Sequence, residues 1–295
     1  CQSFKMVGLL SSCPSALVPI TQTMLETRTA GMSAKMAATS DRSRYQGVPA
    51  HMRALSPADT RPASSLCQRR AAGEPVAYLT GRKAFYGLEL QVDARVLDPR
   101  DDTETLVDWA LSLLPAQAPS RPLRALDLGT GSGAIALALA SQRPQADIWA
   151  SDASADALAV AAANAQRLAL RLNLRQGDWL RAVADAPAFD LIVSNPPYIH
   201  PDEAMEMTPQ VLLHEPHLAL FAPEASPIAY YLALGALIQQ GYLSSGGSLW
   251  VELNPLYAHE TEEALHKFLG PEHCSTQLIG DLSGKERFLH LVYHA

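Results

Sequence analysis

The chain has 295 residues, of which 48% are hydrophobic and 18% charged, a balance that excludes the disordered, collagen-like and disulfide-scaffold classes. No apolar run reaches the about 18 residues that a membrane-spanning helix needs, so a membrane protein is not expected. The net charge of −7 argues against a duplex DNA partner, and four scattered cysteines without a CxxC pair favour a reducing compartment, the cytoplasm.

The charge is divided unevenly along the chain. Residues 1–74 hold 9 Lys and Arg against 4 Asp and Glu, a net charge of +5, whereas residues 75–295 hold 14 against 26, a net charge of −12. This asymmetry predicts a boundary near residue 74. The acidic part is expected not to bind DNA directly, because it would repel the phosphate backbone.

Residues 1–65 are rich in Ser, Thr, Ala and Arg, contain five prolines and show no amphipathic period. We therefore predict that residues 1–74 form a poorly defined segment, either partly disordered or a degenerate helical domain, from which brief proteolysis would remove residues 1 to about 65. An Arg-rich, acid-poor beginning is also typical of organelle transit peptides, and in that case the protein would be mitochondrial.

Residues 75–120 are predicted to form a connector made of a hairpin and a helix. Apolar and polar residues alternate from Leu88 to Val92, and a turn at Asp93–Arg95 leads to Val96 and Leu97, which predicts a β-hairpin. Asp101 precedes Glu104 by three residues, a spacing typical of a capping box, and the following apolar residues keep a helical period until Pro115.

Residues 121–295 alternate between short apolar strands and helices. The predicted strands are 124–128, 147–151, 172–176, 189–194, 248–253, 275–279 and 287–293, and the predicted helices are 134–141, 155–168, 228–240 and 258–268. This order predicts an α/β fold with a Rossmann-like, seven-stranded, mostly parallel sheet. Ligands of such a sheet bind at the carboxyl ends of its strands.

A glycine-rich turn follows the first of these strands. Gly129, Gly131 and Gly133 alternate with Thr130 and Ser132 before an alanine-rich helix. Glycine is needed where the backbone turns tightly and approaches a ligand closely. The spacing is GxGxG rather than the GxGxxG of dinucleotide sites, which favours a nucleoside ligand without pyrophosphate.

Acidic and aromatic residues end the next two strands. Asp152 ends the second strand, where a carboxylate can accept both hydroxyls of a ribose. Asp178 and Trp179 follow the third strand and could present a carboxylate and a ring to an adenine, although Trp179 could equally be an ordinary core residue.

The segment Asn195-Pro196-Pro197-Tyr198 follows the strand that ends at Ser194. Two prolines stiffen this loop, leave their carbonyls free to accept hydrogen bonds and hold Asn195 in extended geometry. A planar NH₂ group could donate to the Asn195 side chain and to the Pro196 carbonyl, while Tyr198 packs on its plane. The pattern therefore predicts a site for a planar amide or amine substrate.

No metal site is predicted. The nine histidines form no HExxH motif and do not stand beside cysteines at ligand spacing. His214 and His217 are interpreted as surface or packed residues.

These motifs resemble those of the class I methyltransferases that use S-adenosylmethionine, and in combination those of the HemK-type protein-(glutamine) methyltransferases of peptide chain release factors. The resemblance runs from about Leu66 to the end of the chain. It also includes the segments 74–81, 85–87, 96–104, 214–216 and 281–285. The chain departs from the family at Asp101, where a proline is usual, and residues 1–65 match the helical N-terminal domain of the family poorly.

The resemblance implies cofactor contacts from Gly129 to Gly133, Asp152, Trp179 and Asn195, and substrate contacts from Asn195 to Tyr198, with Asn195, Pro196 and Tyr198 as the catalytic residues. The implied reaction moves a methyl group from S-adenosylmethionine to the glutamine amide nitrogen in the Gly-Gly-Gln loop of a release factor. Alternatives are a glutamine of a ribosomal protein, an adenine amino group of nucleic acid, or a non-catalytic partner of translation that binds S-adenosylmethionine.

Overall fold

The computed structural model describes residues 65–113, 121–223, 226–281 and 283–295. All of them lie within one compact unit, Arg61–Ala295. The predictions made for residues 1–64, including their loose order and their removal by proteolysis, fall outside the described residues. The division of the chain into residues 1–74, 75–120 and 121–295 stays a prediction.

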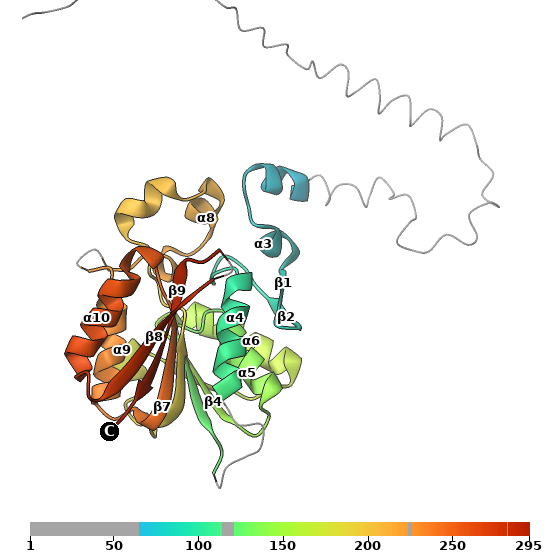
Figure 1. The fold of residues 1–295 in the computed structure, drawn as a ribbon. Helices are drawn as coiled ribbons and strands as arrows, with labels where there is room; N and C mark the ends of the chain where they lie inside the picture. The colour runs from blue at the N-terminus through green and yellow to red at the C-terminus, as the bar shows by residue number, and fades with distance from the viewer. Residues whose placement is uncertain (1–64, 114–120, 224–225, 282) are drawn as a thin grey trace, which may run out of the picture. The chain divides into compact units, whose positions relative to one another are not determined.

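In the described part of the chain, seven strands form one twisted sheet in the order β5-β4-β3-β6-β7-β9-β8 (Figure 1). The strands are β3 (Arg124–Leu128), β4 (Asp147–Asp152), β5 (Asn173–Gln176), β6 (Phe189–Ser194), β7 (Leu243–Glu252), β8 (Cys274–Gly280) and β9 (Glu286–Tyr293). The first five in the spatial order pair in parallel, and β9 runs antiparallel to both of its neighbours. The predicted Rossmann-like, mostly parallel sheet is confirmed.

Helices cover both faces of this sheet (Figure 1). One face carries α4 (Asp101–Leu113), α5 (Ala134–Gln142) and α6 (Ala155–Leu168), and the other carries α7 (Trp179–Ala182), α9 (Ala229–Gln239) and α10 (Ala258–Leu269). Every residue of α5 from Ala134 to Ala140 is buried, which explains why this stretch is entirely apolar. No helix among the described residues is long and apolar enough to cross a membrane.

The hairpin before the sheet is built from different residues than expected. It pairs β1 (Arg82–Phe85) with β2 (Leu88–Gln91) through Tyr86 and Gly87, whose φ angles are 48° and 74°. Two positive φ angles in a two-residue loop match the twist of a hairpin. The predicted second strand at Val96 and Leu97 is wrong, because the Val96 carbonyl accepts the Tyr78 hydroxyl instead of a strand partner.

The capping box predicted at Asp101 and Glu104 is also wrong, because Asp101 is already the first residue of α4. The Glu104 Oε1 atom accepts the backbone N–H of Tyr86 at 2.7 Å. The Asp101 carboxylate lies 3.2 Å from Lys83 Nζ. The two acids therefore attach the hairpin to the start of α4.

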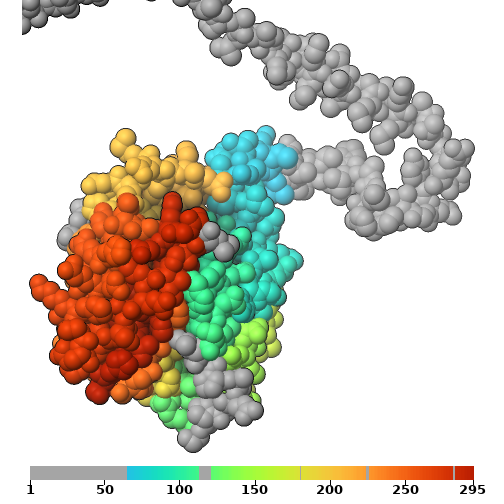
Figure 2. Space-filling view, viewed as in Figure 1, coloured from blue at the N-terminus to red at the C-terminus, as the bar shows by residue number. Residues whose placement is uncertain are grey.

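The loop after β6 contains short helices. These are η3 (Pro201–Glu206), α8 (Pro209–His214) and η4 (His217–Ala219). Figure 2 shows this segment, in yellow, beside the helical residues 65–71 in cyan. Arg70 donates to the Gln210 side chain at 2.9 Å, and His214 Nε2 lies 3.2 Å from the Ala72 carbonyl oxygen. Residues that precede the sheet in the chain thus meet the loop between β6 and β7.

Asn164, buried in α6, links three parts of the fold. Its Oδ1 accepts the Gln91 N–H at 2.7 Å, and its Nδ2 donates to the carbonyls of Gln91 and Ser132 at 2.9 and 3.0 Å. One side chain therefore joins β2, the glycine-rich turn and α6.

Replacement of Asn164 by alanine is expected to lower the free energy of unfolding by about 2–3 kcal/mol, because it leaves buried backbone groups unpaired. Urea denaturation of Asn164→Ala measures this change. Gln166→Ala removes an exposed amide from the same helix and is the control, expected within about 0.5 kcal/mol of the parent chain. Equal stability of Asn164→Ala and Gln166→Ala would contradict the linking role.

Candidate functional site

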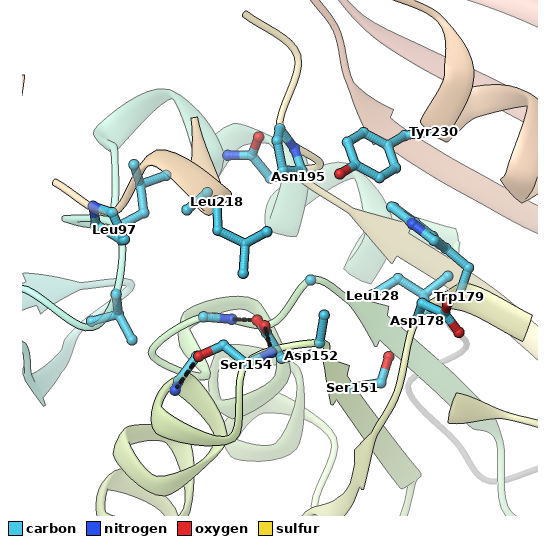
Figure 3. Close-up of a pocket in the computed structure, with 18 of the residues that line it drawn as sticks. Leu97, Leu128, Ser151, Asp152, Ser154, Asp178, Trp179, Asn195, Leu218 and Tyr230 are labelled. Carbon is cyan, nitrogen blue, oxygen red and sulfur yellow. Dashed lines mark hydrogen bonds between the residues drawn. The ribbon is translucent and has the colours of Figure 1, made fainter. Parts of the chain in front are cut away.

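A pocket of about 360 Å³ opens at the carboxyl ends of β3, β4, β5 and β6. Figure 3 shows its two ends, with Trp179 and Tyr230 side by side at one and Leu97 at the other. Its lining residues come from the strand ends, from loops folded over them and from the first turns of α6, α7 and α9: Arg95, Val96, Leu97, Leu128, Gly129, Gly131, Ser151, Asp152, Ala153, Ser154, Ala157, Gly177, Asp178, Trp179, Asn195, Pro197, Pro216, Leu218, Ala219 and Tyr230.

The glycine-rich turn forms part of the pocket floor with only two of its five residues. Gly129 and Gly131 line the pocket and have φ angles of 74° and 54°. A Cβ atom at Gly131 would meet nothing within 4 Å, so the space in front of this backbone is open. At Gly133, by contrast, a Cβ would lie 3.1 Å from Leu137 and 3.2 Å from Ala161. Gly133 therefore serves the packing of α5 against α6.

Thr130 and Ser132 are buried, and the Thr130 side chain fixes the turn to the strand before it. The Thr130 hydroxyl donates to Asp127 Oδ2 at 2.6 Å, and the same oxygen accepts the Ala136 N–H at 3.1 Å. Burial raises the pKa of Asp127 to about 7, against the opposing effect of these two donors. Asp127 is a supporting residue that the sequence analysis missed, although an acid inside an apolar strand was a signal.

Asp152 stands at the end of β4 and lines the pocket, as predicted from its position. Its Oδ2 accepts the Gly131 N–H and its Oδ1 accepts the Ser154 N–H, both at 2.9 Å (Figure 3). Burial raises its pKa, and the backbone donors act in the opposite direction. Each carboxylate oxygen keeps a further lone pair for a ligand hydroxyl.

Trp179 is accompanied by an aromatic residue that the sequence analysis did not single out. Tyr230, at the start of α9, places its ring 4.9 Å from that of Trp179, with 39° between the planes. Both rings line the pocket together with Asp178. Tyr230 lies in an apolar helix far along the chain, so no local pattern marked it.

The opposite wall comes from two loops. Residues 95–97 follow the hairpin and residues 216–219 follow α8. Glu215, whose side chain is buried, accepts Arg100 Nη2 at 2.7 Å and the Asp98 N–H at 3.3 Å, so it ties the two loops together. Leu218 from the second loop projects into the pocket above Asp152 (Figure 3).

Asn195 and its neighbours separate this pocket from a second one. The second pocket has a volume of about 260 Å³. Its lining residues are Leu97, Arg100, Asn195, Pro196, Tyr198, Ile199, Met207, Thr208, Val211, Ala219 and Leu220. Asn195 lines both pockets, whereas Pro197 faces the first and Pro196 and Tyr198 face the second. The structure thus brings Asn195 together with Gly129, Gly131, Asp152, Asp178 and Trp179.

Two polar side chains of this loop have internal partners. Asn195 Nδ2 donates to the Thr103 hydroxyl at 3.2 Å, and the Tyr198 hydroxyl donates to Glu252 at 3.0 Å. Neither Thr103 nor Glu252 was singled out from the sequence, although a lone acid ending the apolar strand β7 was a usable signal. Within the described ranges, no group of three or more His, Cys, Asp and Glu residues is arranged to hold a metal ion.

Comparison with known proteins identifies the family of this chain. A release factor glutamine methyltransferase from Bordetella pertussis is 44% identical over 198 residues, which are 67% of this chain and 71% of that protein. One from Streptococcus pneumoniae is 38% identical over 222 residues, 75% of this chain and 76% of that protein. The chain belongs to the release factor glutamine methyltransferase family. The family predicted from the sequence is confirmed.

A model of the methyltransferase small domain family matches residues 103–221, the part that carries the glycine-rich turn and the Asn195 loop. Among solved structures, the human methyltransferase 10 domain containing protein has a TM-score of 0.52 at 13% identity. The match covers 82% of this chain and 100% of that structure. At this identity the likeness concerns the fold alone, which is that of a methyltransferase domain.

Proposed function

We propose that this chain transfers a methyl group from S-adenosylmethionine to the side-chain amide nitrogen of the glutamine in the Gly-Gly-Gln loop of a peptide chain release factor. One observation carries the proposal: Asn195 lines both pockets, which also share Leu97 and Ala219. One pocket suits a nucleoside cofactor and the other suits a narrow side chain. The names of the relatives supply the substrate class.

The first pocket fits S-adenosylmethionine in its chemistry. The backbone at Gly131 borders open space, so it would cradle the amino-acid end of the cofactor. Asp152 would accept the ribose hydroxyls, and the rings of Trp179 and Tyr230 would contact the adenine beside Asp178. When bound, the cofactor supplies a methyl group activated by a positively charged sulfur.

The second pocket would receive the glutamine side chain. Most of its wall is apolar, and polar acceptors are supplied where it meets Asn195 and Pro196. The Asn195 amide donates its NH₂ to Thr103, so its Oδ1 is free to accept a hydrogen from the substrate amide. The Pro196 carbonyl can accept the other hydrogen of that NH₂ group.

Catalysis in this proposal depends on orientation. An amide nitrogen is a poor nucleophile because its lone pair is delocalised. Two acceptors that hold both N–H bonds point the nitrogen toward the first pocket and lower the barrier by fixing the reacting geometry before the reaction. The Tyr198 ring, held through its hydroxyl by Glu252, completes the wall of the substrate pocket.

The proposal extends to the setting of the reaction. Release factors act during translation, so the proposed setting is the cytoplasm, or the mitochondrion if residues 1–65 are a transit peptide. Residues 1–74, with a net charge of +5, are proposed to contribute to recognition of the release factor. The net charge of −12 on residues 75–295 disfavours DNA as the substrate, because few phosphates would be neutralised on binding.

Replacement of Asp152 by alanine is expected to weaken binding of S-adenosylmethionine by about 1–3 kcal/mol, because charge-assisted hydrogen bonds to the ribose are lost. Isothermal titration calorimetry measures the change. Asp156→Ala is the matched control, since it removes the same charge from an exposed position at the start of α6 and should bind as tightly as the parent chain. Unchanged affinity in Asp152→Ala would contradict the assignment.

Replacement of Asn195 by alanine should reduce the rate of methyl transfer by the equivalent of about 2–4 kcal/mol, the scale for removing one positioned polar group. The assay uses the full chain, labelled S-adenosylmethionine and purified release factor, followed by mapping of the modified residue. Asn173→Ala removes a partly buried amide in β5, outside both pockets, and should keep the parent rate.

Two results of this assay would overturn the proposed function. The first is a normal rate in Asn195→Ala. The second is label on adenine of a DNA fragment, or on a ribosomal protein, with none on the release factor glutamine. Binding of cofactor without transfer to any of these substrates would instead identify a non-catalytic partner of translation.

A further inference from the structure

Glu252 is a buried carboxylate that lines neither pocket but contacts Tyr198, which lines the second pocket, and Thr103, which holds Asn195. It is the last residue of β7 and is 2% exposed. Its Oε2 accepts the Thr103 hydroxyl at 2.9 Å, and its Oε1 accepts the Tyr198 hydroxyl at 3.0 Å. Thr103, in the first turn of α4, is 4% exposed. Two distant elements thus meet behind the Asn195 loop.

The direction of these hydrogen bonds follows from the chemistry of the groups. The Thr103 hydroxyl donates its single hydrogen to Glu252 Oε2, so this hydrogen is committed to the carboxyl group. The Thr103 oxygen can then act toward Asn195 only as an acceptor. It takes its hydrogen from Asn195 Nδ2 at 3.2 Å. An asparagine amide held in this way cannot exchange the positions of its nitrogen and oxygen without losing that bond.

We propose that Glu252 and Thr103 are positioning residues that fix which end of the Asn195 amide faces the substrate. The carboxylate sets the direction of the Thr103 hydroxyl, and the hydroxyl sets the direction of the amide. Asn195 therefore presents an oxygen, the acceptor that a substrate NH₂ group requires, and an inverted amide would present a second donor. This inference rests on the proposed function, because it concerns the orientation of the same amide acceptor.

The other contacts of Glu252 hold its side chain in place. The pKa of Glu252 is raised overall, because burial, together with the charge of Asp102, outweighs the hydroxyls of Thr103 and Tyr198 and the charge of Arg287, which lower it. Arg287 is itself held by Asp281, whose Oδ2 accepts its Nε at 3.0 Å. The Asp281 carboxylate also accepts the N–H groups of Ser283 and Lys285 at 2.8 and 3.0 Å, so the turn between β8 and β9 supports this cation.

Two substitutions of Thr103 distinguish a purely structural role from an orienting role, because the two roles rank their damage in opposite order. Thr103→Val keeps the branched shape of the side chain and removes the hydroxyl. Thr103→Ser keeps the hydroxyl and removes a buried methyl group. If Thr103 only fills space, serine is the more damaging replacement. If Thr103 orients Asn195, valine is the more damaging one.

The test measures kcat and KM for release-factor methylation in full-length variants, together with calorimetry for S-adenosylmethionine. We expect kcat to fall at least about tenfold in Thr103→Val and to stay within about threefold of the parent in Thr103→Ser. Cofactor affinity should stay unchanged in both, because Thr103 does not line the first pocket. In an Asn195→Ala background, Thr103→Val should cause no further loss, since it acts through that amide.

Thr261→Val is the matched control. The Thr261 hydroxyl is buried in α10 and has no hydrogen-bond partner among the described residues, so its removal should leave kcat unchanged. A parent-like kcat in Thr103→Val, or a Thr103→Ser variant as slow as Thr103→Val, would overturn the inference while leaving the proposed function intact. Absence of methylation by the parent chain would overturn the proposed function and this inference with it.

Discussion

The central strands β3 and β6 are covered by apolar helices on both faces, so a ligand can reach them only where they end. The chain leaves β3 toward β4 and β5 on one side and returns to β6 on the other. The loops after β3 and β6 therefore diverge around a crevice. The glycine-rich turn and the Asn195 loop border this crevice, and a Cβ at Gly129 would stand 3.9 Å from the Asn195 carbonyl oxygen. Both pockets follow from this one constraint.

Carboxylates that are buried or, at Asp152, half-buried hold the loops around the crevice in place. Asp127 supports the glycine-rich turn, Asp152 accepts two backbone N–H groups, Glu215 joins the two loops of the opposite wall, and Glu252 holds Thr103 and Tyr198. A buried carboxylate is costly unless its oxygens are paired, so each of these contacts favours one loop geometry over the alternatives. A site organised in this way needs little rearrangement when a substrate amide arrives.

The elements outside the sheet complete the pockets. The segments 95–97 and 216–219 line the first pocket, and Leu97 and Ala219 from them also line the second. They belong to the connector and to the segment after α8. The Tyr78 hydroxyl holds the first of these loops, and Glu215 links it to the second through Arg100. The sheet and its helices alone would leave the first pocket open on this side. The hairpin, bound to α4 through Glu104, is thus part of the site's architecture rather than a separate module.

The pattern of apolar residues by itself determined the order of strands and helices in residues 121–295, because side-chain period is a local property. It placed β3, β6 and α6 at their observed bounds. It also revealed the glycine-rich turn, Asp152 and the Asn195 loop, since backbone restrictions at glycine and proline are visible in the residue types. The same local reasoning paired the wrong strands in the hairpin, where the positive φ of Tyr86 left no signal.

Only the tertiary structure decided which of these residues face the pockets. It buried Thr130 and Ser132 and set Tyr230 beside Trp179. It also brought Glu252 to Thr103 across a separation of 149 residues. Such contacts depend on how two helical layers pack on a sheet, which brings distant segments together. No spacing along the chain encodes that packing, so the motifs were readable in the sequence and the side chains that orient them were not.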